Sequence, residues 1–141
     1  MKFDQVIDKI GNVPYLAISG ECALEEVSEK IIQMPQVRGI YVVDEKKRLQ
    51  GYLSLGILIR HVIAARHKPH FHVRSLLTMI TAEKVADIME KDVICAQKDD
   101  TLETVLDKMV LRNIKQVPVV NEDRQIIANV GVLDLWKLIE K

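Results

Sequence analysis

The sequence has few cysteines, few aromatic residues and no long apolar run. Only two of its 141 residues are cysteines and six are aromatic. Cys22 and Cys95 are far apart and form no CxxC pair, which argues against a disulfide framework or a zinc site. No apolar run approaches the roughly 18 residues that a membrane-spanning helix needs, and the N-terminus has no signal-peptide core. We therefore expect a cytoplasmic protein with no membrane segment in this chain.

The motifs of common enzymes are also missing. The chain has neither a Gly-rich phosphate loop nor a Ser-His-Asp grouping, so we do not expect an enzyme and assign no catalytic residue. Nucleic-acid binding is not expected either. It would need aromatic side chains interleaved with the basic stretch, and only Phe71 offers one.

Aliphatic residues dominate the apolar part of the chain. Ile, Val and Leu together supply 47 residues, one third of the sequence, as is usual in layered α/β proteins. A chain of this length buries about 68% of the surface that its unfolded form exposes. The length is therefore sufficient for one ordinary domain, or for two small modules that share a core.

Charge is balanced overall but unevenly distributed. The formal net charge is zero. No Asp or Glu occurs between Lys46 and Ala82, a stretch that carries seven cations and all four histidines. This asymmetry indicates an anionic partner more clearly than the overall balance does.

The chain repeats itself. Residues 15–24 align without gaps on residues 93–102, and residues 41–51 align on residues 118–128. Only one residue of slippage separates the two blocks. Two copies of one unit therefore fill most of the chain, which decides the fold class.

Both copies show the same order of apolar patterns, α-β-α-β-β-α. Short apolar runs predict strands at residues 15–18, 39–43, 49–54, 93–96, 116–120 and 126–130. Helical spacing predicts helices at residues 3–10, 55–65, 84–90 and 132–140, and two more through Leu24, Val27 and Ile31 and through Leu102, Val105 and Met109. We expect a first repeat at residues 1–65 and a second at residues 82–141.

Residues 66–81 have no counterpart in the second repeat and form a basic, His-rich insert. Its candidate anion-binding residues are Arg66, His67, Lys68, His70, His72 and Arg74. They could contact phosphates, a polyanion or an acidic partner. The histidines could instead bind a transition metal, but their spacing matches no defined zinc motif, and we assign no metal ligand. A solvated basic loop is the third alternative.

The repeat and several of its phrases resemble the CBS domain pair, also called a Bateman module. These phrases are YVVDEK at 41–46, KVADIM at 84–89 and VPVV at 117–120. With GYLSL at 51–55, the first repeat is also similar to the cytosolic CBS pair of MgtE-type magnesium transporters. The resemblance covers nearly the whole chain apart from the insert. It implies a mixed α/β fold of the α+β type, with two repeats related by pseudo-twofold symmetry.

A regulatory binding module is what this resemblance implies. CBS pairs commonly bind adenosine-containing ligands such as AMP, ADP, ATP or S-adenosylmethionine in the clefts between their repeats, and they often form homodimers. We therefore expect a sensor of such a ligand that needs no cofactor, forms a homodimer and acts on an unidentified protein. Two alternatives stay open: a Mg²⁺-sensing cytosolic part of a transporter, and a dimerisation module whose ligand sites have decayed.

The family's ligand signature is a Ser or Thr at the end of the last strand, followed by Asp three residues on. The resemblance implies that the hydroxyl and the N–H groups at the helix start bind the phosphate of a ligand, and that the Asp binds its ribose. The first repeat has Ser54 but Ile57, and the second has Asp134 but Gly131. We therefore favour the second site.

The predicted ligand-binding residues are Asp134, Gly131, Pro118, Val117 and Ser54. Purely structural roles are the alternative for two of them. Ser54 is a natural helix N-cap, and the helix dipole stabilises Asp134 whether or not a ligand is bound.

Overall fold

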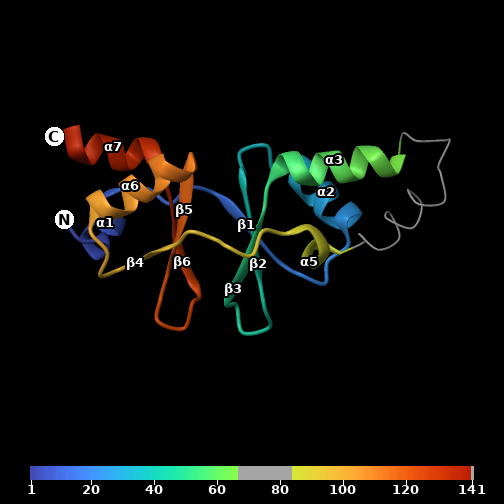
Figure 1. Ribbon diagram of the computed structural model, residues 1–141, viewed down its shortest axis with the longest axis horizontal. Helices are drawn as coiled ribbons and strands as arrows, with labels where there is room; N and C mark the ends of the chain where they lie inside the picture. The colour runs from blue at the N-terminus through green and yellow to red at the C-terminus, as the bar shows by residue number, and fades with distance from the viewer. Residues whose placement is uncertain (67–83, 141) are drawn as a thin grey trace. The chain divides into compact units, whose positions relative to one another are not determined.

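The computed structural model describes residues 1–66 and 84–140, without the side chains of residues 64–66. These residues form six helices and six strands, and the strands make two three-stranded sheets (Figure 1). The α+β class predicted from the repeated pattern is confirmed.

The chain divides into two compact units, and each of them is discontinuous in sequence. Unit 1 comprises Met1–Pro14, Lys46–Leu49 and Ile94–Lys141. Unit 2 comprises Tyr15–Glu45 and Gln50–Val93. Each unit therefore contains most of one repeat, together with the first part of the other repeat.

Unit 2 is built on a sheet with the strand order β1-β2-β3. Its strands are β1 (Tyr15–Ser19), β2 (Gly39–Val43) and β3 (Leu49–Leu53), and its helices are α2 (Leu24–Ile32), α3 (Leu55–Arg66) and α5 (Val85–Ile88). β1 and β2 run parallel. Strands and helices share one aliphatic core, which includes Ile18, Val27, Ile40, Leu53 and Leu58.

Unit 1 repeats this plan with the strand order β4-β5-β6. Its strands are β4 (Ala96–Gln97), β5 (Gln116–Val120) and β6 (Ile126–Gly131), and its helices are α1 (Phe3–Lys9), α6 (Leu102–Arg112) and α7 (Val132–Glu140). β4 runs parallel to β5, and β6 runs antiparallel to β5. Thr101 caps α6, because its Oγ1 accepts a hydrogen bond from the Thr104 N–H at 3.2 Å.

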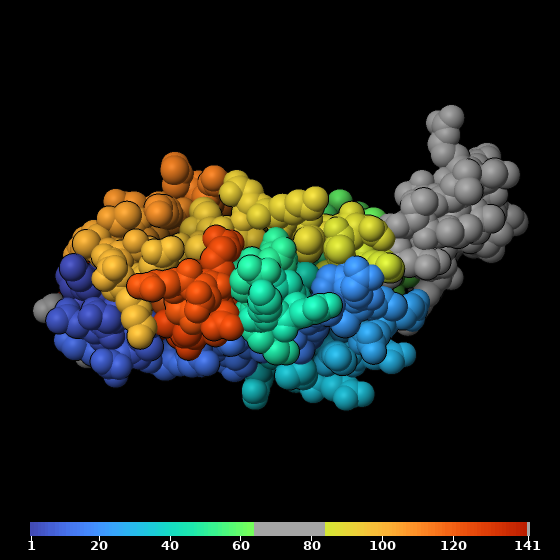
Figure 2. All heavy atoms as spheres, turned by 90° about the horizontal axis from the view of Figure 1, so that it is seen from below, coloured from blue at the N-terminus to red at the C-terminus, as the bar shows by residue number. Residues whose placement is uncertain are grey.

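The first helix of each repeat packs into the core of the unit that is built mainly from the other repeat. Phe3 and Val6 of α1 are fully buried in the core of unit 1, and the Leu102 N–H donates to the Met1 carbonyl at 2.8 Å. In Figures 1 and 2 the dark-blue α1 lies beside the orange segment that contains α6. Val85 of α5 is likewise fully buried in the core of unit 2. Burying such a side chain stabilises a fold by about 1.5–3 kcal/mol, so each unit depends on its added helix.

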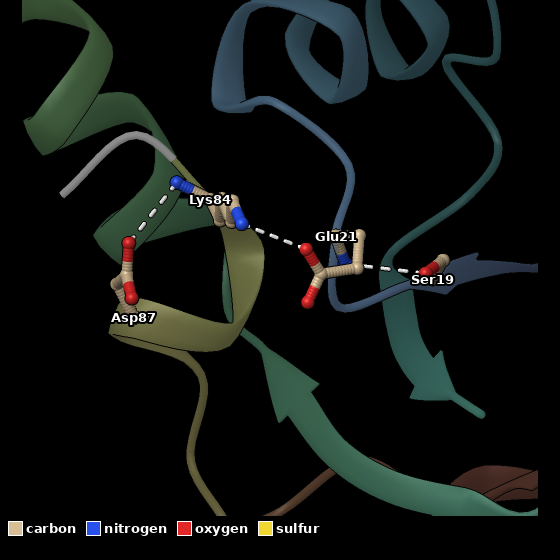
Figure 3. Close-up of polar contacts among 4 residues, drawn as sticks. All are labelled: Ser19, Glu21, Lys84 and Asp87. Carbon is tan, nitrogen blue, oxygen red and sulfur yellow. Dashed lines mark hydrogen bonds and ion pairs between the residues drawn. The ribbon is translucent and has the colours of Figure 1, made fainter.

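Polar contacts hold the start of α5 against the loop that follows β1 (Figure 3). Lys84 Nζ lies 2.8 Å from Glu21 Oε2, and the Lys84 N–H donates to Asp87 Oδ2 at 3.2 Å. The Glu21 N–H donates to Ser19 Oγ at 3.1 Å. The charged side chains are more than half exposed, so this ion pair contributes only about 0–1 kcal/mol. Burial of Val85 therefore stabilises the position of α5 more than the ion pair does.

Two predicted elements are shorter in the structure. The strand predicted at residues 93–96 is reduced to Ala96–Gln97. Ala96 pairs with Val119, so a continued ladder would place Cys95 opposite Pro118, which has no N–H to donate. The helix predicted at residues 84–90 is a single turn, because the chain becomes extended at Met89.

After α5, Glu90 runs alongside β3 at a glycine. Tyr52 and Glu90 exchange two backbone hydrogen bonds of 2.8 Å. A Cβ atom on Gly51 would lie 2.6 Å from Met89 Sδ and 2.8 Å from the Glu90 carbonyl oxygen. The close approach of these two segments therefore requires glycine at position 51.

We predict that Gly51→Ala lowers the free energy of unfolding by about 1–3 kcal/mol, because the Glu90 backbone must move. Gly56→Ala is the matched control, since a Cβ atom there meets nothing within 4 Å and the residue lies in α3. That change should be neutral or stabilise by about 0.5–1 kcal/mol. Urea denaturation measures both, and equal effects would contradict the packing of Glu90 on β3.

Candidate functional site

Asp134 lies in the first turn of α7, three residues after the end of β6. Its side chain is half-buried. Within residues 1–66 and 84–140, its carboxylate has neither a hydrogen-bond partner nor an ion-pair partner. A carboxylate that is partly withdrawn from water and unpaired is available to a ligand that donates hydrogen bonds.

Gly131 contributes no side chain beside this carboxylate. A Cβ atom added to Gly131 would lie 3.4 Å from Val13 Cγ2, 3.6 Å from Asp134 Oδ2 and 3.9 Å from the Lys115 carbonyl oxygen. These are ordinary contact distances, and Gly131 does not have a positive φ. The backbone therefore does not require glycine at position 131, and a small side chain would fit there. Glycine at this position means that the hydroxyl of the family's signature is missing.

A buried asparagine fixes the segment Asn12–Val13 beside β6. Asn129 is fully buried, and its N–H donates to Asn12 Oδ1 at 2.6 Å. The Val13 N–H donates to the Asn129 carbonyl at 2.8 Å, and Asn129 Nδ2 donates to Gln116 Oε1 at 2.8 Å. Buried amides need such partners, so this network holds Val13 in place next to Gly131. Our sequence analysis did not identify Asn129. The sequence contains one signal for its role, because Asn129 is a single amide residue within the apolar pattern of β6.

The two predicted residues of β5 have different surroundings. Val117 is fully buried in the core of unit 1, where its side chain is occupied by packing. Pro118 is also buried, but it points to the opposite face of the strand, the face that it shares with its pairing partner Asn129. The structure thus brings Gly131 and Asp134 together and places the Val117 side chain elsewhere.

Ser54 has a structural role at the start of α3. Its Oγ accepts a hydrogen bond from the Ile57 N–H at 3.2 Å, and its carbonyl accepts from the Leu58 N–H at 3.1 Å. Ile57, which stands where the signature has Asp, packs partly buried against the core of unit 2. Ligand contact by Ser54 stays a prediction.

Three tyrosines form a cluster in unit 2 that our sequence analysis also missed. The ring centroids of Tyr15 and Tyr41 are 5.6 Å apart, and those of Tyr41 and Tyr52 are 5.7 Å apart. Burial raises the pKa of Tyr41, and the neighbouring Tyr52 and Tyr15 raise it further. Burial, with a contribution from Glu90, also raises the pKa of Tyr52. Both hydroxyls are therefore neutral at physiological pH.

Cys22 and Cys95 are free thiols and are partly buried. Burial raises the pKa of Cys95, so little of its thiol is ionised at neutral pH.

Among the described residues, no three His, Cys, Asp or Glu side chains gather closely enough to hold a metal ion. In the same part of the chain, no helix is both long and apolar enough to cross a membrane.

The basic cluster of the insert lies outside the described residues. His67, Lys68, His70, His72 and Arg74 all fall there, and only the backbone of Arg66 is described, at the end of α3. Anion binding by this cluster stays a prediction.

We predict that Ser54→Ala lowers the free energy of unfolding by about 1 kcal/mol, because the Ile57 N–H loses its partner. Ser54→Asp is the matched control, since Asp is an equally good N-cap, and it should leave stability close to wild type. Thermal denaturation of both proteins measures the effect. If both substitutions destabilise equally, Ser54 does not act as a cap.

Two sheets of the same topology, each followed by a helix that starts at the end of the last strand, define a tandem α+β module. The chain belongs to the CBS domain family, whose domain matches residues 7–64 and 85–141. The resemblance drawn from the repeated phrases is confirmed. CBS pairs are in general regulatory modules and not catalytic ones.

Three similar proteins illustrate the range of the family. Inosine-5'-monophosphate dehydrogenase of Methanocaldococcus jannaschii is 26% identical over 107 residues, which cover 76% of this chain and 18% of that protein. The cytosolic domain of the Mg²⁺ channel MgtE, crystallised in complex with ATP, is 30% identical with a TM-score of 0.69, over 88% of this chain and 44% of that one. The expected similarity to the MgtE cytosolic part is therefore confirmed.

The third protein matches this chain from end to end. It is the CBS domain pair of protein MJ0100 in complex with 5'-methylthioadenosine and S-adenosyl-L-methionine. It shares 19% sequence identity and a TM-score of 0.69, over 99% of both chains, and so shows the same fold. This chain spans less than a third of the length of the curated relatives that it matches.

Proposed function

We propose that the protein is a regulatory module that binds an adenosine-type ligand at Asp134. The observation that carries the proposal is the unpaired, half-buried Asp134 carboxylate beside Gly131, which contributes no side chain. A carboxylate accepts two hydrogen bonds at once, so it suits the adjacent hydroxyl groups of a ribose.

The ligands of similar proteins support the adenosine part of the proposal. The MgtE cytosolic domain was crystallised with ATP, and the MJ0100 pair with 5'-methylthioadenosine and S-adenosylmethionine. All three compounds share an adenosine with free ribose hydroxyls. An adenosine compound is therefore the ligand class with which to test Asp134.

Regulation follows if the ligand binds two conformations of the protein unequally. A ligand shifts such an equilibrium only by its difference in affinity for the two states. The regulated partner would be a protein or domain that senses this shift. The two free thiols fit the reducing cytoplasm that we propose as its location.

We predict that Asp134→Ala weakens the binding of adenosine compounds about ten- to a hundred-fold, as loss of a hydrogen bond to a charged group does. Isothermal titration with 5'-methylthioadenosine, S-adenosylmethionine, AMP, ADP and ATP measures this effect. Asp107→Ala is the matched control, because Asp107 is an exposed carboxylate on α6 of the same unit. No heat with any of these ligands, or equal loss in both variants, would contradict the proposal.

We further propose that two copies of the chain form a homodimer through exposed apolar helix faces. On α7, Leu133 is 71% exposed and Trp136 is 52% exposed. On α3, Ile59 and Ile63 are each 51% exposed and line an apolar groove of about 550 Å³ between α2 and α3. Apolar side chains this exposed mark an interaction surface. A second copy is the occupant that we favour, because a twofold interface places the same patches of two chains together.

The homodimer predicts that Trp136→Glu shifts the protein toward monomer, since a charge would be buried at the interface. Lys137→Glu, an exposed neighbour on the same helix, is the matched control and should leave the dimer intact. Size-exclusion chromatography with light scattering gives the mass of each variant. A monomeric wild type at micromolar concentration would contradict the homodimer.

A further inference from the structure

We infer that the contact between two copies of the chain is reciprocal: Leu133 and Trp136 on α7 of each copy pack into the groove between α2 and α3 of the other copy. The inference rests on the homodimer proposed above, and it names which surface meets which. The alternative is a dimer in which groove meets groove and α7 meets α7. A twofold axis permits both arrangements, because it requires only that the two chains use the same patches.

The groove is an apolar depression on the surface of unit 2. Helices α2 and α3 pack side by side (Figure 1), and the groove between them has a volume of about 550 Å³. Pockets of about this volume hold drug-sized molecules, so an indole and a leucine side chain fit together in one of them. Ile59 and Ile63 line the groove from α3, and Ile32, which is 71% exposed, lines it from α2.

Helix α7 presents a row of apolar side chains that suits such a groove. Leu133, Trp136 and Ile139 follow one another at intervals of three residues and are 71%, 52% and 39% exposed. Side chains at this spacing are neighbours on a helix surface, and a helix that binds in a groove uses anchors spaced in this way. Leu135 is fully buried in the core of unit 1 and holds α7 in place. The row is therefore already formed in each chain and needs no ordering on contact.

Charge at the groove disfavours contact between two grooves. Among the described residues that line the groove, Arg38 is the only charged one, and its Nη1 donates to the Pro35 carbonyl at 2.8 Å. Arg60 is exposed beside Ile59, and α3 contains no acidic residue. Groove-to-groove contact would bring the cations of two copies together, and like charges across an interface repel one another.

Helix α7 supplies the opposite charge. It carries Asp134 and Glu140 against Lys137, which gives two negative charges, one positive charge and a net charge of −1. Glu140 is exposed in the last turn, next to Ile139. Packing α7 into the groove therefore brings a negative helix to a positive surface. A reciprocal dimer forms this favourable pairing twice, whereas self-pairing forms it at neither contact.

Photo-cross-linking of the full chain tests the inference. A photoreactive benzoylphenylalanine replaces Ile63, which lines the groove, and mass spectrometry identifies the captured peptide in the product that has the mass of two chains. We expect capture of the peptide that contains Leu133 and Trp136. Benzoylphenylalanine in place of Lys30 is the matched control, since Lys30 is an exposed residue of α2 that does not line the groove, and it should not capture that peptide.

The other outcomes overturn the inference and are distinguishable from failure of the homodimer. Capture of a peptide from α2 or α3 of the second copy would show groove-to-groove contact. Capture within one chain would show that the chain covers its own groove, and a dimer that yields no product would place the groove outside the interface. These three results leave the homodimer in place. A wild type that light scattering shows to be monomeric removes the homodimer and the inference together.

A double-mutant cycle gives a second measurement that needs no cross-linker. Ile59→Ala and Trp136→Ala should each raise the Kd of the dimer about ten-fold or more, because each removes a buried anchor. In the double variant the increase should be smaller than the product of the two, since both substitutions remove the same contact. Analytical ultracentrifugation measures the three values, and circular dichroism establishes that each variant is folded. An increase equal to the product would overturn the inference, because the groove and α7 would then lie in separate contacts.

Discussion

Burial of the N-terminal helix in the core of unit 1 is the constraint on which the rest of the structure depends. Phe3 and Val6 complete a core whose other fully buried residues come from the second repeat, and the chain passes from unit 1 into unit 2 after Pro14. Between α1 and that point the chain runs beside β6, where hydrogen bonds to the buried Asn129 fix Asn12 and Val13. Packing of a helix from one end of the chain thereby builds a wall of the candidate ligand site at the other end.

The two repeats have kept complementary halves of one signature, and the structure gives each half different surroundings. In unit 2 the hydroxyl of Ser54 is used as a helix cap, and Ile57 packs against the core. In unit 1 the carboxylate of Asp134 has no partner among the described residues, and the neighbouring Gly131 contributes no side chain. A group already engaged in folding must exchange a partner to bind a ligand, whereas an unpaired group need not. The difference favours unit 1 as the binding unit.

Much of the fold could be predicted from the sequence, because strongly apolar runs and helical spacing are local signals. The strands Gly39–Val43 and Gln116–Val120 and the helix Val132–Glu140 have the bounds predicted for them. The proximity of Gly131 and Asp134 was also predictable, since three residues across a strand–helix junction are close in space. Pairing partners are not local. The shortening of β4 depends on which residue faces Pro118, and the exchange of α1 between repeats depends on a core that forms only in three dimensions.

The crystal structure of the protein with 5'-methylthioadenosine tests the central claim most directly. We expect both ribose hydroxyls to donate hydrogen bonds to the Asp134 carboxylate. A ribose bound away from Asp134, with that carboxylate still unpaired, would contradict it.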